Sequence, residues 1–191
     1  MSTIKVNFAS LNSEYLDPSS IQYKKIRLVN TSISKADSLL DIGVGTGEFI
    51  KLNINKFDEI CGVDTDKESL KVFMERFKTK KNVHIIESDL KHLNILFLNN
   101  QFDYITCLDV LEYIILQKCK TVLQNIYKMT KKFGFFILTG PGIFEKFRIL
   151  MRVSPTHLYS YSSYGWIKLM DQLIITIYEN TSPFLPRVRS N

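Results

Sequence analysis

The chain has 191 residues, of which 45% are hydrophobic and 23% charged, and its formal net charge is +6 at pH 7. This length fits one domain and excludes two of typical size, and the composition excludes a disordered or fibrous chain. Residues 131–191 hold 8 Lys/Arg against 3 Asp/Glu, whereas residues 1–130 hold 17 against 16. Any signal for an anionic partner therefore comes from the C-terminal part.

The cysteines and the start of the chain bear on its compartment. No stretch reaches the roughly 18 uninterrupted apolar residues of a membrane span, and the first residues lack the apolar core of a signal peptide. Cys61, Cys107 and Cys119 are odd in number and show no CxxC spacing. We expect a cytoplasmic protein with reduced thiols, without disulfides and without a metal.

The first expected element is a helix with Asp17 as its N-cap and Pro18 in its first position. Short strands and helices then alternate. The expected strands are the runs SLLDIG, EICGVD, NVHIIESD, FDYITCLD and FGFFILTG. Apolar strands separated by crossover helices are typical of a parallel sheet covered on both faces. We predict an α/β fold, a three-layer, Rossmann-like, doubly wound and mostly parallel sheet. Beyond residue 140 we expect helices near 143–152 and 163–171 and a last strand, LIITIYEN.

The run LLDIGVGTGEFI, residues 39–50, places glycines at 43, 45 and 47 directly after the first strand. Ligands of such sheets bind beyond the carboxyl ends of the strands, and the first strand-to-helix turn forms the floor of that site. Bare backbone there lets a ligand approach the chain closely. The spacing therefore predicts a ligand site at this turn.

The acidic residues around this turn indicate which ligand binds. A dinucleotide motif GxGxxG requires glycine at position 48, where this chain has Glu48, and Asp41 adds another negative charge, so a nicotinamide-dependent oxidoreductase is disfavoured. Asp64 ends the second strand, 21 residues after Gly43, where an acid can accept both ribose hydroxyls. Asp89 ends the third strand, where an adenine amino group needs an acceptor. The predicted ligand is an adenosine without a phosphate.

Five segments, in this order, resemble the class I S-adenosylmethionine-dependent methyltransferases, of the ubiquinone/menaquinone type or of the methyltransferase-domain 11 or 25 type. They are LLDIGVGTG, GVDTDKESL, ESDL, FDYITCLDVLEYI and KKFGFFILTGPG. The resemblance implies S-adenosyl-L-methionine as cofactor. It also implies a set of cofactor-binding residues: Asp41, Gly43, Gly45, Gly47, Asp64, Thr65, Asp89, Leu90 and Leu108. For Asp41 and Asp89, a helix-capping role is the alternative.

Methyl transfer to a protonated nucleophile also needs a base within hydrogen-bond reach. The resemblance makes His157 the first candidate, with substrate binding or loop packing as its alternative, and Asp109 and Glu112 follow. Tyr113 departs from the histidine often found at its position in relatives. Cys107 lacks a neighbouring proline, so we expect a buried strand thiol rather than a nucleophile.

The resemblance implies one methyltransferase domain over residues 1–191. It comprises an N-terminal helical cap (1–36), a cofactor-binding core (37–140), and substrate-side helices with the last strand (141–191). The expected acceptor is an oxygen, nitrogen or carbon atom of a small molecule, a lipid-quinone-like compound or a tRNA base. Residues 143–152 would contact a membrane surface or an anionic substrate, or would simply cover the sheet, and a homodimer would cover an unpaired sheet edge. The alternative is a catalytically inactive methyltransferase-like partner or regulatory subunit.

Overall fold

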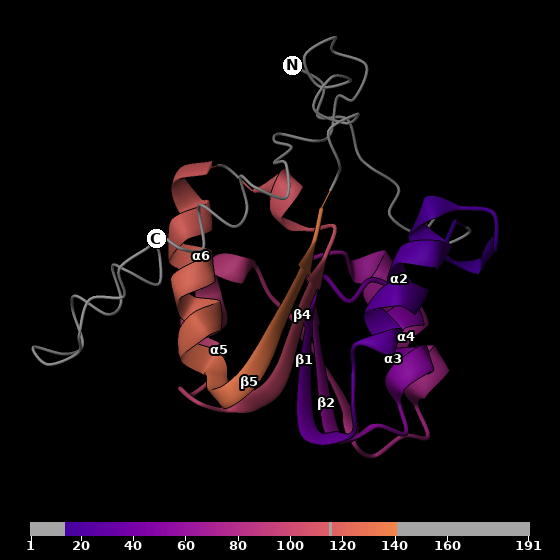
Figure 1. Ribbon diagram of the computed structural model, residues 1–191, viewed down its shortest axis with the longest axis horizontal. Helices are drawn as coiled ribbons and strands as arrows, with labels where there is room; N and C mark the ends of the chain where they lie inside the picture. Colours follow the sequence, from indigo (N-terminus) through magenta and orange to yellow (C-terminus); the bar gives the residue numbers. More distant parts are fainter. Residues whose placement is uncertain (1–13, 115, 141–191) are drawn as a thin grey trace, which may run out of the picture.

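The computed structural model describes residues 14–114 and 116–140, and a parallel sheet forms its centre. The strand order is β3-β2-β1-β4-β5, and each neighbouring pair runs parallel. The strands are β1 (Ala36–Ile42), β2 (Phe57–Asp64), β3 (Val83–Glu87), β4 (Phe102–Leu108) and β5 (Thr130–Thr139). They correspond to the five predicted strands and confirm the Rossmann-like fold (Figure 1).

Helices cover both faces of this sheet, so the fold has three layers (Figure 1). One face carries α2 (Ile21–Thr31), α3 (Glu48–Asn53) and α4 (Lys67–Phe77), and the other carries α5 (Leu93–Leu96) and α6 (Leu116–Met129). Two short 3₁₀ helices, η1 (Leu90–His92) and η2 (Leu111–Tyr113), follow β3 and β4. Strand order reverses between β1 and β4, which is where such sheets bind ligands. Among the described helices, none combines the length and the apolar character needed to cross a membrane.

The central strand, β1, is buried on both faces, because the side chains on its two faces enter two different hydrophobic cores. Leu39 packs with Phe49 and Phe73 under α2, α3 and α4, whereas Leu40 packs with Ile126 under α6. Both leucines are fully buried. Burying one leucine side chain contributes about 1.5–3 kcal/mol, so the near-continuous apolar strands stabilise both layers at once.

The first described long helix begins later than the sequence predicts. Asp17 does not cap it, because its carboxylate accepts hydrogen bonds from the backbone N–H and the hydroxyl of Ser19 in the preceding turn. Ser20 is the N-cap of α2, and its hydroxyl accepts the N–H of Tyr23. The predicted Asp17 cap is therefore wrong, since a nearer hydroxyl satisfies the same helix end.

Strand β5 begins earlier than predicted, and its first part is irregular. Phe102 on β4 faces Thr130, but Tyr104 faces Phe135, so residues 131–134 bulge out of the ladder. Phe133 in this bulge has φ of 69° and is 87% exposed. The bulge joins α6 to the regular part of β5 without a separate loop. The helices and last strand predicted after residue 140 lie outside the described residues.

Candidate active site

The turn between β1 and α3 has a backbone that its glycines make attainable. Gly43, Gly45 and Gly47 have φ of 75°, 54° and 80°, in the left-handed region that favours glycine. A Cβ at Gly43 would lie 2.1 Å from Val110 Cγ2, and one at Gly47 would lie 2.5 Å from Phe77 Cε2. At both positions the bare backbone is therefore required by neighbours within the protein as well as by the turn.

Asp64 connects this glycine loop to the end of β2. Its Oδ2 accepts the N–H of Gly45 at 2.8 Å, and its Oδ1 accepts the N–H groups of Thr65 at 2.7 Å and Asp66 at 2.9 Å. A carboxylate has about four lone-pair sites, so capacity remains on Oδ2 for a hydroxyl donor. An acid beside the glycine loop at the carboxyl end of β2 is what a ribose-binding site requires, and the two features fit S-adenosylmethionine.

Asp41 lies inside the sheet rather than at a helix end. Its side chain is buried, and Oδ1 accepts the hydroxyl of Thr106 at 2.6 Å. Burial raises the pKa of Asp41 to about 7, the hydrogen bond from Thr106 opposes this rise, and the charge of Asp64 adds to it. The N-cap of α3 is Gly47, without a side-chain cap, so Asp41 does not have the alternative capping role.

Asp89 does cap a helix. Its Oδ1 accepts the N–H of Lys91 at 3.0 Å at the start of η1, and its Oδ2 lies 3.3 Å from Lys91 Nζ. The hydrogen bond from this backbone N–H is the main cause of its lowered pKa. The side chain is 53% exposed, while Leu90 is half-buried against the second core. Within the described chain, Asp89 therefore has the helix-capping role that was its alternative.

The end of β4 holds an ion pair that the sequence did not predict. Leu108 is buried, and Asp109 follows it with φ of 56°. Lys25 Nζ on α2 donates to both Asp109 oxygens, at 2.6 and 2.7 Å, and Thr139 Oγ1 on β5 donates to Oδ1 at 3.2 Å. Three elements therefore meet at Asp109 across the carboxyl edge of the sheet.

A phenol and a second acid lie near this ion pair. Glu112 on η2 is only 2% exposed. Burial raises the pKa of Tyr15, and the charges of Asp109, Asp41 and Glu112 raise it further. The sequence also did not predict Tyr15 as a residue of this site. The three acids near it are distant in the sequence, so no spacing of residues indicates their contact.

Glu48 does not face the ligand side as a free charge. Its Oε1 lies 2.6 Å from Arg76 Nη2 on α4, and the carboxylate side chain is 9% exposed. The sequence indicated a negative charge at position 48, but the Arg76 guanidinium neutralises this carboxylate. The missing glycine at position 48 still separates the turn from a dinucleotide motif.

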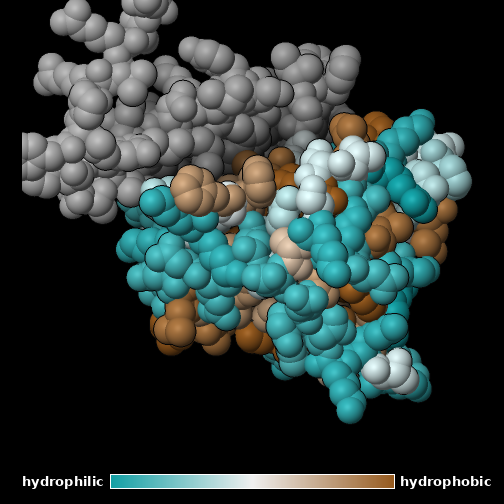
Figure 2. Space-filling view, turned by 60° about the horizontal axis from the view of Figure 1, so that its bottom comes forward, coloured by the Kyte–Doolittle hydropathy of each residue, from teal (hydrophilic) through white to brown (hydrophobic). Residues whose placement is uncertain are grey.

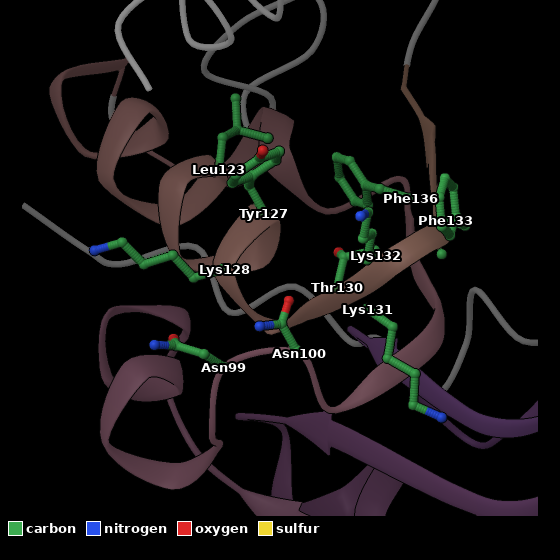
Figure 3. A pocket seen from close by; sticks show the side chains of 11 residues that line it. Asn99, Asn100, Leu123, Tyr127, Lys128, Thr130, Lys131, Lys132, Phe133 and Phe136 are labelled. Atoms are coloured by element: carbon green, nitrogen blue, oxygen red, sulfur yellow. The ribbon is translucent and has the colours of Figure 1, made fainter. Parts of the chain in front are cut away.

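His157 lies outside the described residues, as does the segment 143–152. A hollow of about 730 Å³ lies at the amino end of β5, between the end of α6 and the bulge, with Asn99, Tyr127, Lys128 and Phe133 among its lining (Figure 3). It lies at the opposite end of the sheet from the glycine loop. Figure 2 brings this end of the sheet forward and shows a largely hydrophilic face.

Within the described ranges, no group of three or more His, Cys, Asp or Glu side chains is placed to hold a metal ion.

Known proteins are similar to this chain. The methyltransferase domain family matches residues 40–138. The chain is 24% identical over 106 residues to a demethylmenaquinone methyltransferase of Staphylococcus carnosus, an alignment that covers 54% of this chain and 43% of that protein. The chain therefore spans less than half the length of this curated relative.

Solved structures agree on the fold. A SAM-dependent methyltransferase from Archaeoglobus fulgidus superposes with a TM-score of 0.70 at 16% identity, covering 88% of this chain and 74% of that one. Phosphoethanolamine N-methyltransferase 2 of Haemonchus contortus, solved with S-adenosyl-L-methionine, gives a TM-score of 0.66 at 19% identity, covering 87% of this chain and 40% of that one. The chain belongs to the methyltransferase domain family, and its resemblance to the class I S-adenosylmethionine-dependent methyltransferases is confirmed.

Proposed function

We propose that this chain is a methyltransferase (EC 2.1.1) that uses S-adenosyl-L-methionine to methylate an oxygen, nitrogen or carbon atom of a small molecule, a lipid-quinone-like compound or a tRNA base. The observation that carries the proposal is the hydrogen bond between Asp64 and the Gly45 N–H. This bond joins Asp64, the proposed ribose-binding acid, to the glycine loop at the carboxyl ends of the strands. Strand order reverses beside this point. A chain that had lost its cofactor would not need this pairing, so the inactive-partner alternative is disfavoured.

The proposed cofactor site uses the residues that the resemblance implies. The backbone of the glycine loop would line the methionine part, and Asp64 with Thr65 would hold the ribose. Asp89 would accept from the adenine amino group while Leu90 packs on the ring. Asp41 and the carbonyl groups near Leu108 would face the ammonium group. When bound, S-adenosylmethionine supplies an activated methyl group on a sulfonium, which needs no metal.

The raised pKa of Asp41 suits a position that faces the cationic part of the cofactor. An acid whose pKa is about 7 loses its proton readily when a positive charge approaches. The sulfonium and ammonium groups of the proposed cofactor are both cationic. Binding would therefore favour the ionised form of Asp41, and Thr106 would hold the carboxylate in place.

The chain's own groups would then orient the acceptor and take its proton. We propose His157 as the base. Asp109 and Glu112 are the other candidates, but both Asp109 oxygens are bound by Lys25, so a proton would have to displace that contact. Asp109 is therefore better suited to position the acceptor side than to deprotonate it, whereas Glu112 lies buried close by.

The acceptor side would be built by residues 1–36 and 141–191, around the core of residues 37–140. The S. carnosus relative is named for a quinone, and the H. contortus protein is named for phosphoethanolamine, so the relatives support small-molecule acceptors. The basic segment 143–152 supports contact with an anionic substrate or a membrane surface. A homodimer would cover the sheet edge.

The first test is calorimetric titration of the purified chain with S-adenosylhomocysteine. We expect binding to the wild type and at least a tenfold loss of affinity in Asp64→Ala, because the variant removes the ribose acceptor and the contact with Gly45. Asp58→Ala, an exposed acid on the same strand, is the matched control and should bind normally. NADH should not bind. An unchanged affinity in Asp64→Ala, or no binding to the wild type, contradicts the proposal.

A second step identifies the acceptor class. Methyl-labelled S-adenosylmethionine is incubated with quinol-type phenols, phosphoethanolamine or tRNA, and the transferred label is measured at low and high salt. Transfer to tRNA should weaken as salt rises, whereas transfer to an uncharged quinol should not. Cofactor binding without transfer to any class would favour the regulatory alternative.

A further inference from the structure

Arg76, on the helix that follows β2, reaches back to the far end of the glycine loop. Its Nη1 donates to the carbonyl oxygen of Thr46 at 2.8 Å, and its Nη2 lies 2.6 Å from Glu48 Oε1. One guanidinium therefore spans the last residues of the loop and the first residue of α3. The planar fork of arginine can hold two acceptors at once, which a lysine ammonium cannot do with the same geometry.

Backbone hydrogen bonds already hold part of this loop, since the Gly47 N–H donates to the Val44 carbonyl at 2.9 Å and the Val44 N–H to the Val63 carbonyl at 3.1 Å. Arg76 adds side-chain contacts at its far end. Gly47 is the N-cap of α3 in a left-handed conformation, and it has no side chain to close the helix end. A glycine backbone samples many conformations when nothing holds it. Asp64 fixes the loop at Gly45, and Arg76 fixes it at Thr46 and Glu48. Asp64 ends β2, whereas Arg76 lies in the last turn of α4, so two different elements hold the loop.

Glu48 and Arg76 are both largely buried, with side chains 9% and 27% exposed. Removing only one charge would leave the other buried without compensation, which destabilises a protein whether or not a ligand binds. A function in ligand binding must therefore be separated from this general effect. The hydrogen bond from Arg76 to the Thr46 carbonyl allows this separation, because a carbonyl group carries no net charge and its loss leaves no buried charge behind.

We infer that Arg76 is a positioning residue of the cofactor site, which holds the glycine loop in its ligand-ready shape through the Thr46 carbonyl and Glu48. This inference rests on the proposed function, since it names the residue that prepares the loop for S-adenosylmethionine. Without Arg76 the loop visits other conformations, and affinity falls in proportion to the fraction of time in which the ready shape is populated.

The test uses three variants of the full chain. Arg76→Met removes the guanidinium, and Arg76→Met/Glu48→Met removes both charges, so that no buried charge is left alone. Lys71→Met is the matched control, because Lys71 lies on the same helix with its side chain 66% exposed. S-adenosylhomocysteine is titrated into each variant well below its unfolding temperature, and hydrogen exchange is measured without ligand.

In both Arg76 variants, Kd should rise roughly tenfold, as expected if the ready loop is populated about a tenth of the time. Amide exchange should accelerate in the peptide covering 42–50 and stay unchanged in the peptide covering β4. Lys71→Met should match the wild type in both measurements. The double variant keeps the test valid if Arg76→Met fails to fold.

A double variant that binds and exchanges like the wild type would overturn the inference, since Arg76 would then only neutralise Glu48. Equal acceleration in the loop and β4 peptides would also overturn it, because that pattern reports general destabilisation. If the wild type binds no S-adenosylhomocysteine, the proposed function fails instead, and the exchange experiment still decides whether Arg76 fixes the loop.

Discussion

Replacing Gly43 by alanine would add a methyl group in space that Val110 already fills. The new Cβ would lie 2.1 Å from Val110 Cγ2, and the backbone would have to keep φ of +75°. The left-handed backbone costs an alanine roughly 1–2 kcal/mol. Crowding a packed site costs roughly 1–3 kcal/mol more, and the β-branched Val110 has few rotamers in which to avoid it. We expect Gly43→Ala to lower the free energy of unfolding by about 2–5 kcal/mol.

Urea unfolding followed by circular dichroism measures this loss. A second variant, Val110→Ala, separates the two causes, because it removes the crowded methyl groups and leaves the backbone unchanged. In the Val110→Ala background, the cost of Gly43→Ala should fall by about 1–3 kcal/mol, a coupling typical of residues in contact. The reasoning is refuted if Gly43→Ala unfolds at the wild-type midpoint, or if its cost is the same in both backgrounds.

Two further changes test the buried charges of the site. Native Asp41 keeps its proton up to about pH 7, whereas the unfolded chain releases it near pH 4, so this group makes stability fall as pH rises between these values. Asp41→Asn should flatten that fall by up to about 4 kcal/mol between pH 4 and pH 8 in urea unfolding, and parallel wild-type and variant profiles would argue against it. Lys25→Met leaves Asp109 without its ammonium partner and should lower stability by about 2 kcal/mol. Lys25→Met/Asp109→Asn should recover most of that loss in thermal unfolding, and a double variant no more stable than the single one would contradict this.

The elements of the fold follow from local patterns. The apolar runs that became β1, β2 and β4 are short, nearly continuous and separated by helical stripes, a pattern that fits a parallel sheet covered on both faces. The glycine loop was predictable for a related reason. Its conformation depends on the absence of side chains at Gly43 and Gly47, and that absence is visible in the sequence itself.

The contacts that shape the site were not predictable in the same way. Lys25 reaches Asp109 across 84 positions, and Arg76 reaches Thr46 across 30. Long flexible side chains can find partners over such separations without leaving any periodicity or spacing. The prediction of Asp17 as N-cap was wrong for the opposite reason. Asp17, Ser19 and Ser20 are polar residues within one turn, and residue preferences do not show which of them caps the helix.

The bulge of residues 131–134 provides a place to attach a reporter to this protein. It lies at the amino end of the sheet, away from the glycine loop, and Phe133 at its tip is 87% exposed. A dye on a cysteine at position 133 could follow ligand binding without entering the site. Position 134 would be a poor choice, because a Cβ there would lie 2.9 Å from the Asp103 carbonyl oxygen. One end of the fold therefore accepts a label, while the other end has no room for one methyl group at Gly43.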